Sequence, residues 1–321
     1  MTILKMPEKT NALTTKELTG CFVAMATPYT TNERLRPEIN YSAINPLVNH
    51  ILNSDVHGIV VAGCTGSAYG ISIDEQVKLA AEVNKRYGQY TNVIAGDGSN
   101  CTWEVIEMAK RMEEEAEIFT HLMISPYYNK PSDQGLINHY LEITKNIKGN
   151  IILYSVPSRT AGKGITLDVV KELWQHPQII GIKEASGNLE RIANMIEITS
   201  LPKFAVLSGD DSLALKIIRM GGRGHISTSG NVAPREMADV VNYALGMDYR
   251  KAEEVNTRLK PLYSALFPKN DEKNPSPNPS TTHHALRRLG IDVGIPRLPL
   301  CDCSDEEKGY IDAALIDLGF L

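Results

Sequence analysis

One lysine, Lys183, stands near the end of a short apolar run that begins at Ile179. Such a run is typical of a strand buried on both faces, where an ammonium group must find a partner or lose its proton. A lysine without its proton is a nucleophile, which can form an imine with a carbonyl substrate and use it as an electron sink. The alternative is that Lys183 pairs with a carboxylate such as Glu184 or extends to the surface, because perturbed lysines also occur in structural ion pairs.

Residues that suit the same chemistry follow other apolar runs. Tyr154 lies near the end of the preceding run and could transfer protons at an imine carbon's hydroxyl. The turn Gly63–Gly66 offers backbone N–H groups and hydroxyls to a carboxylate, and the planar fork of Arg159 suits a second carboxylate. Further residues at such positions are Thr27, Asp97, Ser99, Asn100, Tyr127, Tyr128, Gly209, Asp210, Asp211, Ile226 and Ser227.

Taken singly, each of these residues has an ordinary structural explanation. A Gly-x-Thr-Gly segment is most often only a turn, the tyrosine pair could lie in an interface, and Arg159 could be a surface residue. Their common placement after successive strands is what indicates a site.

Other conspicuous residues are expected to be structural. Asp210 and Asp211 are predicted to cap a helix at Leu213 rather than to bind a metal, and His225 is predicted to be a packing residue. The acidic run 113–115 is predicted to be a solvated helix face. The pair Cys301 and Cys303 has no nearby histidine or second pair to complete a metal site.

Eight strand-like runs recur at intervals of about 25 to 30 residues, each followed by a helical pattern. Strands that alternate with helices form a parallel sheet, and eight units in about 230 residues predict closure into an α/β fold of the (β/α)₈ TIM-barrel type. The alternative, an open doubly wound sheet, lacks a GxGxxG after its first strand. The runs are Phe22–Thr27, His57–Gly63, Asn92–Gly96, Phe119–Ser125, Asn150–Val156, Ile179–Lys183, Phe204–Gly209 and His225–Ser229.

The pattern predicts one barrel with additions at both ends. Residues 1–19 form an N-terminal arm, residues 20–247 the barrel, and residues 248–321 a C-terminal helical region packed on it, interrupted by an irregular loop at 268–279. Helices are expected to begin near Asp74, Trp103, Pro131 and Pro234. In this class of barrel the active site lies at the C-terminal ends of the strands, where the residues named above are placed.

Composition favours small-molecule chemistry. The 321 residues are 42% hydrophobic and 22% charged with a net charge of −5, so no basic field attracts nucleic acid or an anionic membrane surface. No apolar stretch approaches the roughly 18 to 20 residues that span a bilayer. The polar N-terminal segment does not resemble a secretory signal, and five cysteines at scattered spacing indicate a reducing, cytoplasmic location.

Several motifs together resemble the dihydrodipicolinate synthase family, within the N-acetylneuraminate lyase superfamily of class I aldolase barrels. The resemblance runs from about Gly20 to near the C-terminus, with one local expansion at 268–282. The tyrosine pair and the strand-five motif favour the synthases over the sialic-acid and sugar-acid aldolases. The motifs are Gly63–Gly66, Ala95–Asn100, Pro126–Ser132, Tyr154–Thr160, Gly181–Ala185 and Ser208–Asp211.

The resemblance implies a reaction and a role for each residue. Lys183 forms an imine with pyruvate, which then condenses with L-aspartate-4-semialdehyde to give 4-hydroxy-tetrahydrodipicolinate for lysine and diaminopimelate biosynthesis. Thr65, Ile226 and Gly209 contact substrate, and Arg159 receives the carboxylate of the aldehyde. No metal, nucleotide or flavin is implied, because the imine is the electron sink. A homotetramer, a dimer of dimers, is implied.

The resemblance also implies a proton relay in which Tyr154 exchanges protons and Tyr128 reaches a neighbouring subunit's site. The family's relay threonine is Cys64 in this chain, and a thiol is a weaker hydrogen-bond partner than a hydroxyl. Ser67 and Ser155 replace the family's usual glutamate and asparagine. These departures put the turnover rate and the second substrate in question.

A feedback site for lysine is half present. Asn100, Glu104 and Tyr127 match the family's dimer-interface site, and Tyr69 replaces a small residue there. Ile73 and Gln76 stand where some members have histidines. The resemblance therefore implies that lysine binds at this interface.

Two other functions remain open at this point. The first is another pyruvate-dependent class I aldolase on the same barrel, of the 2-keto-3-deoxy sugar acid, sialic acid or hydratase-aldolase type. The second is a barrel that has lost its chemistry and serves as a binding or regulatory protein, which the thiol of Cys64 would favour.

Overall fold

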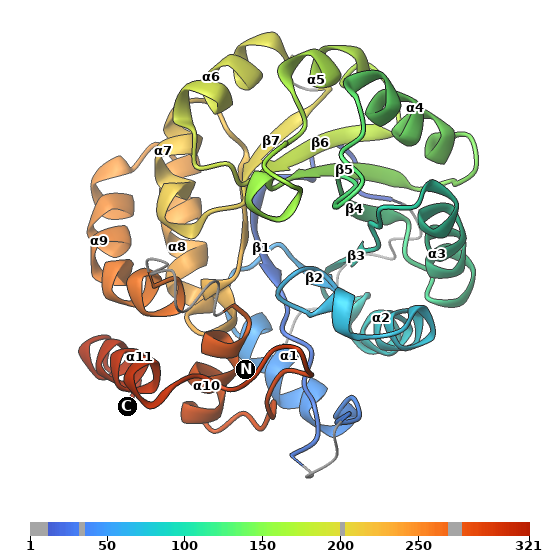
Figure 1. Ribbon diagram of the computed structural model, residues 1–321. Coiled ribbons are helices and arrows are strands. Elements are labelled where there is room, and N and C mark those ends of the chain that lie inside the picture. Colours follow the sequence, from blue (N-terminus) through green and yellow to red (C-terminus); the bar gives the residue numbers. More distant parts are fainter. Residues whose placement is uncertain (1–11, 32–35, 200–202, 269–277) are drawn as a thin grey trace.

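A closed barrel of eight parallel strands forms the centre of the protein, in the order β1 to β8 with β8 pairing back to β1 (Figure 1). The computed structural model describes residues 12–31, 36–199, 203–268 and 278–321. The strands are β1 Gly20–Ala24, β2 Gly58–Val61, β3 Asn92–Gly96, β4 Thr120–Ile124, β5 Asn150–Ser155, β6 Ile179–Glu184, β7 Ala205–Ser208 and β8 Gly224–Ser227.

The strands are buried on both faces, which explains their continuous apolar runs. One cluster of buried side chains fills the barrel, takes members from all eight strands and includes no helix residue; Phe22, Ile152 and Ile226 belong to it. Other clusters join the outer faces of the strands to the helices. The interior is therefore a packed core, as this fold requires.

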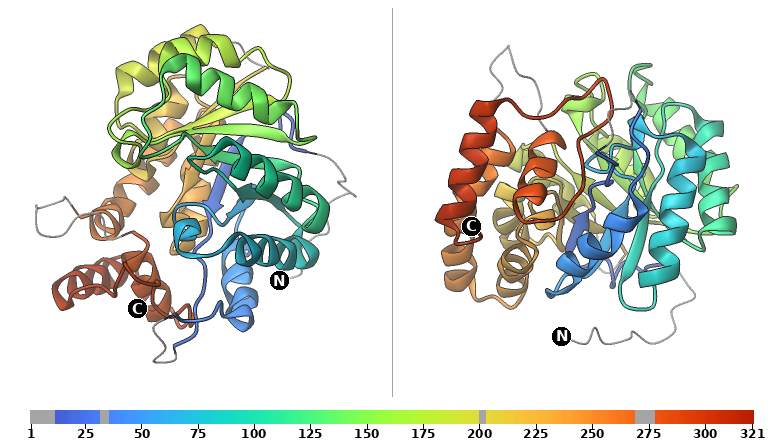
Figure 2. Two further views of the ribbon diagram at one scale, coloured as in Figure 1. Left: turned by 45° about the vertical axis from the view of Figure 1, so that its right-hand side comes forward. Right: turned by 90° about the horizontal axis from the view of Figure 1, so that it is seen from below.

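Helices α1 to α8 follow the strands in turn, α9 packs against α8, and α10 and α11 pack against α9 and each other (Figures 1 and 2). In the described ranges, none of the helices has the length and apolar character needed to cross a membrane. The helices are α1 Ile44–Leu52, α2 Ile73–Tyr87, α3 Thr102–Glu115, α4 Asp133–Thr144, α5 Leu167–Leu173, α6 Leu189–Ile198, α7 Ala214–Arg219, α8 Pro234–Leu245, α9 Tyr249–Leu266, α10 Ser280–Arg288 and α11 Asp305–Asp317.

The segment before β1 closes the N-terminal end of the barrel. Leu13 and Leu18 are buried in the interior cluster. The backbone N–H of Leu13 donates to Thr120 Oγ1 at the start of β4, and Asn150 Nδ2 at the start of β5 donates to the carbonyl of Leu13. Residues 12–19 are thus packed against the barrel; residues 1–11 of the predicted arm lie outside the described residues.

The predicted barrel is confirmed, and the strands differ from the predicted runs by up to three residues at their ends. Local signals explain where helices begin: Ser72 and Glu75 form a capping box for α2, Ser132 caps α4, and Pro234 is the first residue of α8. Most of the predicted irregular loop, residues 269–277, lies outside the described residues.

The prediction that the acidic run 113–115 is wholly solvated was wrong for one residue. Glu114 and Glu115 are exposed, but Glu113 is buried and its Oε1 accepts hydrogen bonds from the backbone N–H groups of Lys148 and Gly149. Its position on α3 turns it toward the barrel, where it lies beside His121 of β4.

Candidate active site

A cavity of about 610 Å³ opens at the C-terminal ends of the strands. The loops after β2, β5, β7 and β8 and the C-terminal helix α9 contribute to its wall, and Lys183 of β6 reaches it from the barrel. Its lining residues are Cys64, Thr65, Tyr154, Val156, Ser158, Arg159, Lys183, Ala185, Gly209, Asp210, Asp211, Ser212, Thr228, Tyr263, Ser264, Phe267, Pro268 and Asn278.

A register shift in β6 directs Lys183 into this cavity. Ile151 pairs with Ile179 but Ile152 pairs with Gly181, so β6 carries one extra residue opposite β5. Ile180 packs inside the barrel whereas Ile182 packs in the outer cluster, which places the next residue, Lys183, on the inner side. Strict alternation from Ile180 would have turned Lys183 outward.

Lys183 is buried beside Tyr154. The two residues are neighbours in the β5–β6 ladder, and Lys183 Nζ lies 4.5 Å from the centroid of the Tyr154 ring. Burial lowers the pKa of Lys183 to about 8, although Cys64 and Asp211 act in the opposite direction. The amine is therefore far easier to deprotonate than an exposed lysine. Burial also raises the pKa of Tyr154, which keeps its hydroxyl protonated near neutral pH.

The turn after β2 brings Cys64 and Thr65 to the cavity. A hydrogen bond stabilises this turn: Thr27 Oγ1 donates to the carbonyl of Gly66 at 2.6 Å. Thr65 Oγ1 lies 2.9 Å from Thr228 Oγ1, and either hydroxyl can be the donor. Two neighbouring hydroxyls thus face the same space as Lys183.

Arg159 and Gly209 also line the cavity, in keeping with their predicted positions. Arg159 ends the short helix Pro157–Arg159 that follows β5. At Gly209 a Cβ atom would lie 2.6 Å from Ala185 Cβ and 3.1 Å from Lys183 Cε. Only glycine leaves the lysine stem this space.

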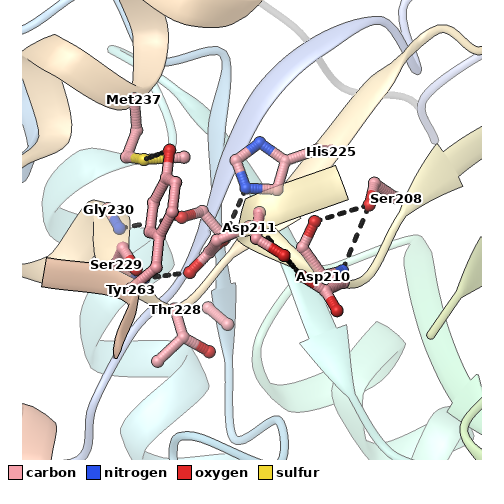
Figure 3. A network of polar contacts seen from close by, with 12 residues as sticks. Ser208, Asp210, Asp211, His225, Thr228, Ser229, Gly230, Met237 and Tyr263 are labelled. Atoms are coloured by element: carbon pink, nitrogen blue, oxygen red, sulfur yellow. Dashed lines mark hydrogen bonds and ion pairs between the residues drawn. The ribbon is translucent and has the colours of Figure 1, made fainter. Parts of the chain in front are cut away.

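The predicted capping role is correct for Asp210 and wrong for Asp211. Asp210 Oδ1 accepts from the backbone N–H of Ser212. Asp211 is buried; its Oδ2 accepts from the N–H of Ser229 at 2.7 Å and its Oδ1 lies 2.7 Å from His225 Nε2 (Figure 3). Burial alone would raise the pKa of Asp211, but these contacts outweigh it and the pKa is lowered. His225 is fully buried, as predicted for a packing residue, and is also hydrogen-bonded.

Some of the predicted residues lie apart from the cavity. Ile226 is buried in the barrel interior, in the same cluster as Tyr154. Tyr128, with a positive φ of 69°, is 88% exposed and is not among the described residues that line the cavity.

The four residues of the predicted lysine site lie after neighbouring strands. Tyr69 follows β2, Asn100 and Glu104 follow β3, and Tyr127 follows β4. Ser99 Oγ donates to Glu104 Oε2, and Asn129 Nδ2 donates to the carbonyl of Asn100.

Thr228 and the residues supplied by α9 and its surroundings were not among the predicted site residues. Thr228 lay inside a predicted strand, and its place two residues after Ile226 was the only signal available. Tyr263 and Ser264 lie in a helix far from any strand end, so nothing in the sequence connected them with the cavity.

Comparison with known proteins gives consistent results. Residues 17–317 match the model of the dihydrodipicolinate synthetase family. The 4-hydroxy-tetrahydrodipicolinate synthase of Methanosarcina mazei is 38% identical over 305 residues, covering 94% of this chain and 99% of that protein. Two crystal structures superpose with a TM-score of 0.87 at 32% identity: DHDPS from Cyanidioschyzon merolae with lysine bound, over 95% and 99% of the two chains, and the chloride-inhibited dihydrodipicolinate synthase from Acinetobacter baumannii complexed with pyruvate, over 95% and 100%.

Proposed function

Because the chain belongs to the dihydrodipicolinate synthetase family, we propose that its cavity is the active site of a 4-hydroxy-tetrahydrodipicolinate synthase with Lys183 as the nucleophile. The enzyme is a class I aldolase-type lyase that condenses pyruvate with L-aspartate-4-semialdehyde to give 4-hydroxy-tetrahydrodipicolinate in lysine biosynthesis. The relatives reported above carry the synthase name, and they give no support to a sugar-acid or sialic-acid aldolase.

One observation carries the assignment of the nucleophile. Lys183 is buried, lines the cavity at the C-terminal end of the barrel, and has its pKa lowered to about 8. Roughly a tenth of the amine is therefore neutral at pH 7, a far larger fraction than for an exposed lysine. The neutral amine is the form that attacks a ketone.

The first half of the reaction activates pyruvate. The neutral Lys183 amine adds to the C2 carbonyl of pyruvate, water leaves, and the resulting iminium withdraws electrons so that a methyl proton is lost to give an enamine. Tyr154 beside the lysine accepts and returns protons in these steps. Thr65 binds the pyruvate carboxylate, and Ile226 in the barrel interior supplies an apolar contact below it.

The second half forms the carbon–carbon bond and releases the product. The enamine carbon attacks the aldehyde of aspartate semialdehyde, whose carboxylate is bound by Arg159 at the cavity wall, with Gly209 contributing backbone to the same wall. The aldehyde oxygen is protonated, and the amino group of the second substrate then replaces Lys183 at the former C2 carbon, which closes the ring and frees the lysine.

Proton transfer in this scheme runs through Cys64 and Tyr128 as well as Tyr154. Cys64 shares the cavity with Tyr154, and a thiol is a poorer relay than a hydroxyl. Tyr128 is largely exposed on its own subunit, which suits a residue that serves a neighbour. The assembly is proposed to be a homotetramer, a dimer of dimers, in the cytoplasm; all five cysteine thiols are free, as is usual in a reducing compartment.

Lysine is proposed to inhibit the enzyme by binding at Tyr69, Asn100, Glu104 and Tyr127. These residues lie after β2, β3 and β4 at the active-site end of the barrel, and the related structure from Cyanidioschyzon merolae contains bound lysine. A titration of the initial rate with L-lysine, with D-lysine as the control, measures this directly. Unchanged rates at millimolar L-lysine would exclude the site.

The assignment of the nucleophile is tested by trapping the imine. The protein is incubated with pyruvate, reduced with borohydride, and analysed by intact mass and peptide mapping, in parallel with Lys183→Ala. We expect one reduced pyruvate adduct per chain, on Lys183, and none in the variant. A wild-type protein without an adduct would show that this barrel does not use imine chemistry.

A further inference from the structure

A pair of hydroxyl groups lines the same cavity as Lys183. Thr65 follows β2 and Thr228 follows β8, and their Oγ1 atoms are 2.9 Å apart. Both residues line the cavity. The contact therefore joins the loops that follow the two strands on either side of β1, at the wall of the cavity.

The pair has a definite consequence for anion binding. Each hydroxyl has one proton, and a carboxylate can only accept. When Thr65 donates its proton to a carboxylate, the Thr228 hydroxyl can donate to Thr65 Oγ1, so that the Thr65 proton is directed into the cavity. Thr228 thus holds Thr65 in the orientation that binds an anion.

The backbone at Thr228 is fixed from two sides. Asn231 Nδ2 donates to the carbonyl of Thr228 at 2.9 Å and to the carbonyl of Ala24 at 2.8 Å, and Asn231 Oδ1 accepts from the N–H of Ala26. On the other side, the N–H of Ser229 donates to Asp211 Oδ2 at 2.7 Å. The segment is consequently tied both to β1 and to the loop after β7.

Asp211 is in turn fixed by His225. The imidazole Nε2 donates to Asp211 Oδ1 at 2.7 Å, and both side chains are buried (Figure 3). A buried carboxylate with both oxygens engaged is rigid, and removing it would leave a backbone N–H and an imidazole without partners. The chain of contacts therefore runs from His225 through Asp211 and Ser229 to Thr228.

We propose that Thr228 is a pyruvate-positioning residue, which orients the Thr65 hydroxyl toward the substrate carboxylate, and that Asp211 with His225 holds Thr228 in place. The inference rests on the proposed function and names residues that act through Thr65. Substitution of Thr228 or Asp211 should weaken the binding of the α-keto acid more than that of the aldehyde.

The first test uses two substitutions at one position. Thr228→Val keeps the shape and removes the hydroxyl, whereas Thr228→Ser keeps the hydroxyl. We expect Thr228→Val to raise the KM for pyruvate roughly three- to tenfold, the effect of one lost hydrogen bond, with the KM for aspartate semialdehyde nearly unchanged. Thr228→Ser should restore the wild-type KM. A Thr228→Val enzyme with the wild-type KM for pyruvate would overturn the proposal.

The second test asks whether Asp211 acts through Thr228. Asp211→Ala should raise the KM for pyruvate in the wild type but change it less than about twofold in the Thr228→Val background, because residues that act as a unit are not additive. Independent, multiplicative effects would overturn the proposed chain of contacts. Asp211→Asn can still accept from Ser229 and donate to His225, so it should keep the wild-type KM for pyruvate, although loss of its charge also acts on Lys183. A rise in KM equal to that of Asp211→Ala would assign the role to charge and overturn the proposed chain of contacts.

Two controls distinguish a failure of this inference from a failure of the proposed function. Asp312→Ala removes the partner of His284 in a second histidine–aspartate pair, on α10 and α11 away from the cavity, and should leave both KM values unchanged. Borohydride trapping of the wild type tests the proposed function itself. An adduct on wild-type Lys183 together with unaltered KM values in the variants would refute this inference alone.

Discussion

At the scale of the residue, Lys183 combines reactivity with a cost to stability. Its side chain is only 5% exposed, and burial favours the neutral amine. The same burial penalises the folded state whenever the amine is charged. Reactivity and destabilisation thus have one physical origin.

We therefore predict that Lys183→Met stabilises the protein at neutral pH while abolishing adduct formation. The pKa is about 8 in the folded chain and 10.5 in the unfolded chain, so the unfolded chain binds the proton more tightly. The variant should gain roughly 3 kcal/mol in the free energy of unfolding at pH 7, measured by urea denaturation.

The pH dependence of that gain follows from the two pKa values. The penalty in the wild type is complete below pH 8, shrinks as the pH rises, and has vanished above 10.5. The advantage of Lys183→Met should shrink over the same interval. Lys85→Met, on the exposed face of α2, is the matched control and should show no such trend. A gain that is constant with pH would refute the explanation.

Sequence patterns could find several residues of the cavity wall, but neither the residues that α9 supplies nor all of the contacts within the wall. One cavity is lined by Lys183, Tyr154, Thr65 and Arg159, because each lies near the C-terminal end of a strand of a parallel barrel or follows one. The function of Asp211 could not be predicted, because an aspartate after a strand can equally cap a helix. Asp211 instead binds Ser229 and His225, and these two residues come close to it only when the barrel is closed.

At the scale of the element, Glu113 links α3 to the barrel through hydrogen bonds. Its Oε1 accepts from the N–H groups of Lys148 and Gly149 at 2.8 and 2.6 Å and lies 3.5 Å from His121 Nε2. His121 Nδ1 lies 2.5 Å from Asp97 Oδ2. Burial alone would lower the pKa of His121, but the two carboxylates raise it to about 9. The buried imidazolium of His121 in β4 thus lies between Glu113 of α3 and Asp97, the residue that follows β3.

We predict that Glu113→Gln lowers the free energy of unfolding by roughly 1 to 3 kcal/mol at pH 7. The amide can still accept from the backbone, so the loss comes from the contact with His121. Glu114→Gln changes the exposed neighbour on the same helix and should be nearly neutral. Urea denaturation of both variants measures the difference.

The effect of Glu113→Gln should depend on pH at both ends. The raised pKa of His121 gives stability that is complete below 6.5 and is lost as the pH rises through about 9. The pKa of Glu113 is lowered by its hydrogen bonds despite burial, so its contribution is lost as the pH falls below its unfolded value of 4.5. A deficit that is equal at pH 7 and pH 10 would exclude an ion pair as its cause.

The elements themselves were largely predictable, because strands buried on both faces give apolar runs at helix-length intervals. The register shift in β6 could not be predicted from the sequence. At Gly181 a Cβ would lie 2.4 Å from the carbonyl oxygen of Ala205, which marks a crowded backbone that the sequence shows only as a glycine. That shift directs Lys183 inward, so the decisive feature of the site depends on pairing between strands.

At the scale of the whole molecule, the C-terminal region completes the cavity. Tyr263 and Ser264 of α9, with Phe267, Pro268 and Asn278 beyond it, form part of the wall. The Tyr263 hydroxyl donates to Asn256 Oδ1 at 3.2 Å, which fixes the ring. This region thus contributes directly to the site as well as to packing.

The proposed role of Tyr128 depends on assembly, because this residue is largely exposed on a single subunit and is not among the described residues that line the cavity. If it serves a neighbouring site, two defective subunits should complement each other. Co-expression of Lys183→Ala and Tyr128→Phe chains with different tags gives a mixed dimer in which one site has an intact Lys183 and receives Tyr128 from its partner.

We expect each single variant to be nearly inactive and the purified mixed assembly to recover a substantial part of wild-type kcat. A mixed assembly no more active than its parents would place Tyr128 in its own subunit's site, and Tyr127→Phe in the same design is the matched control.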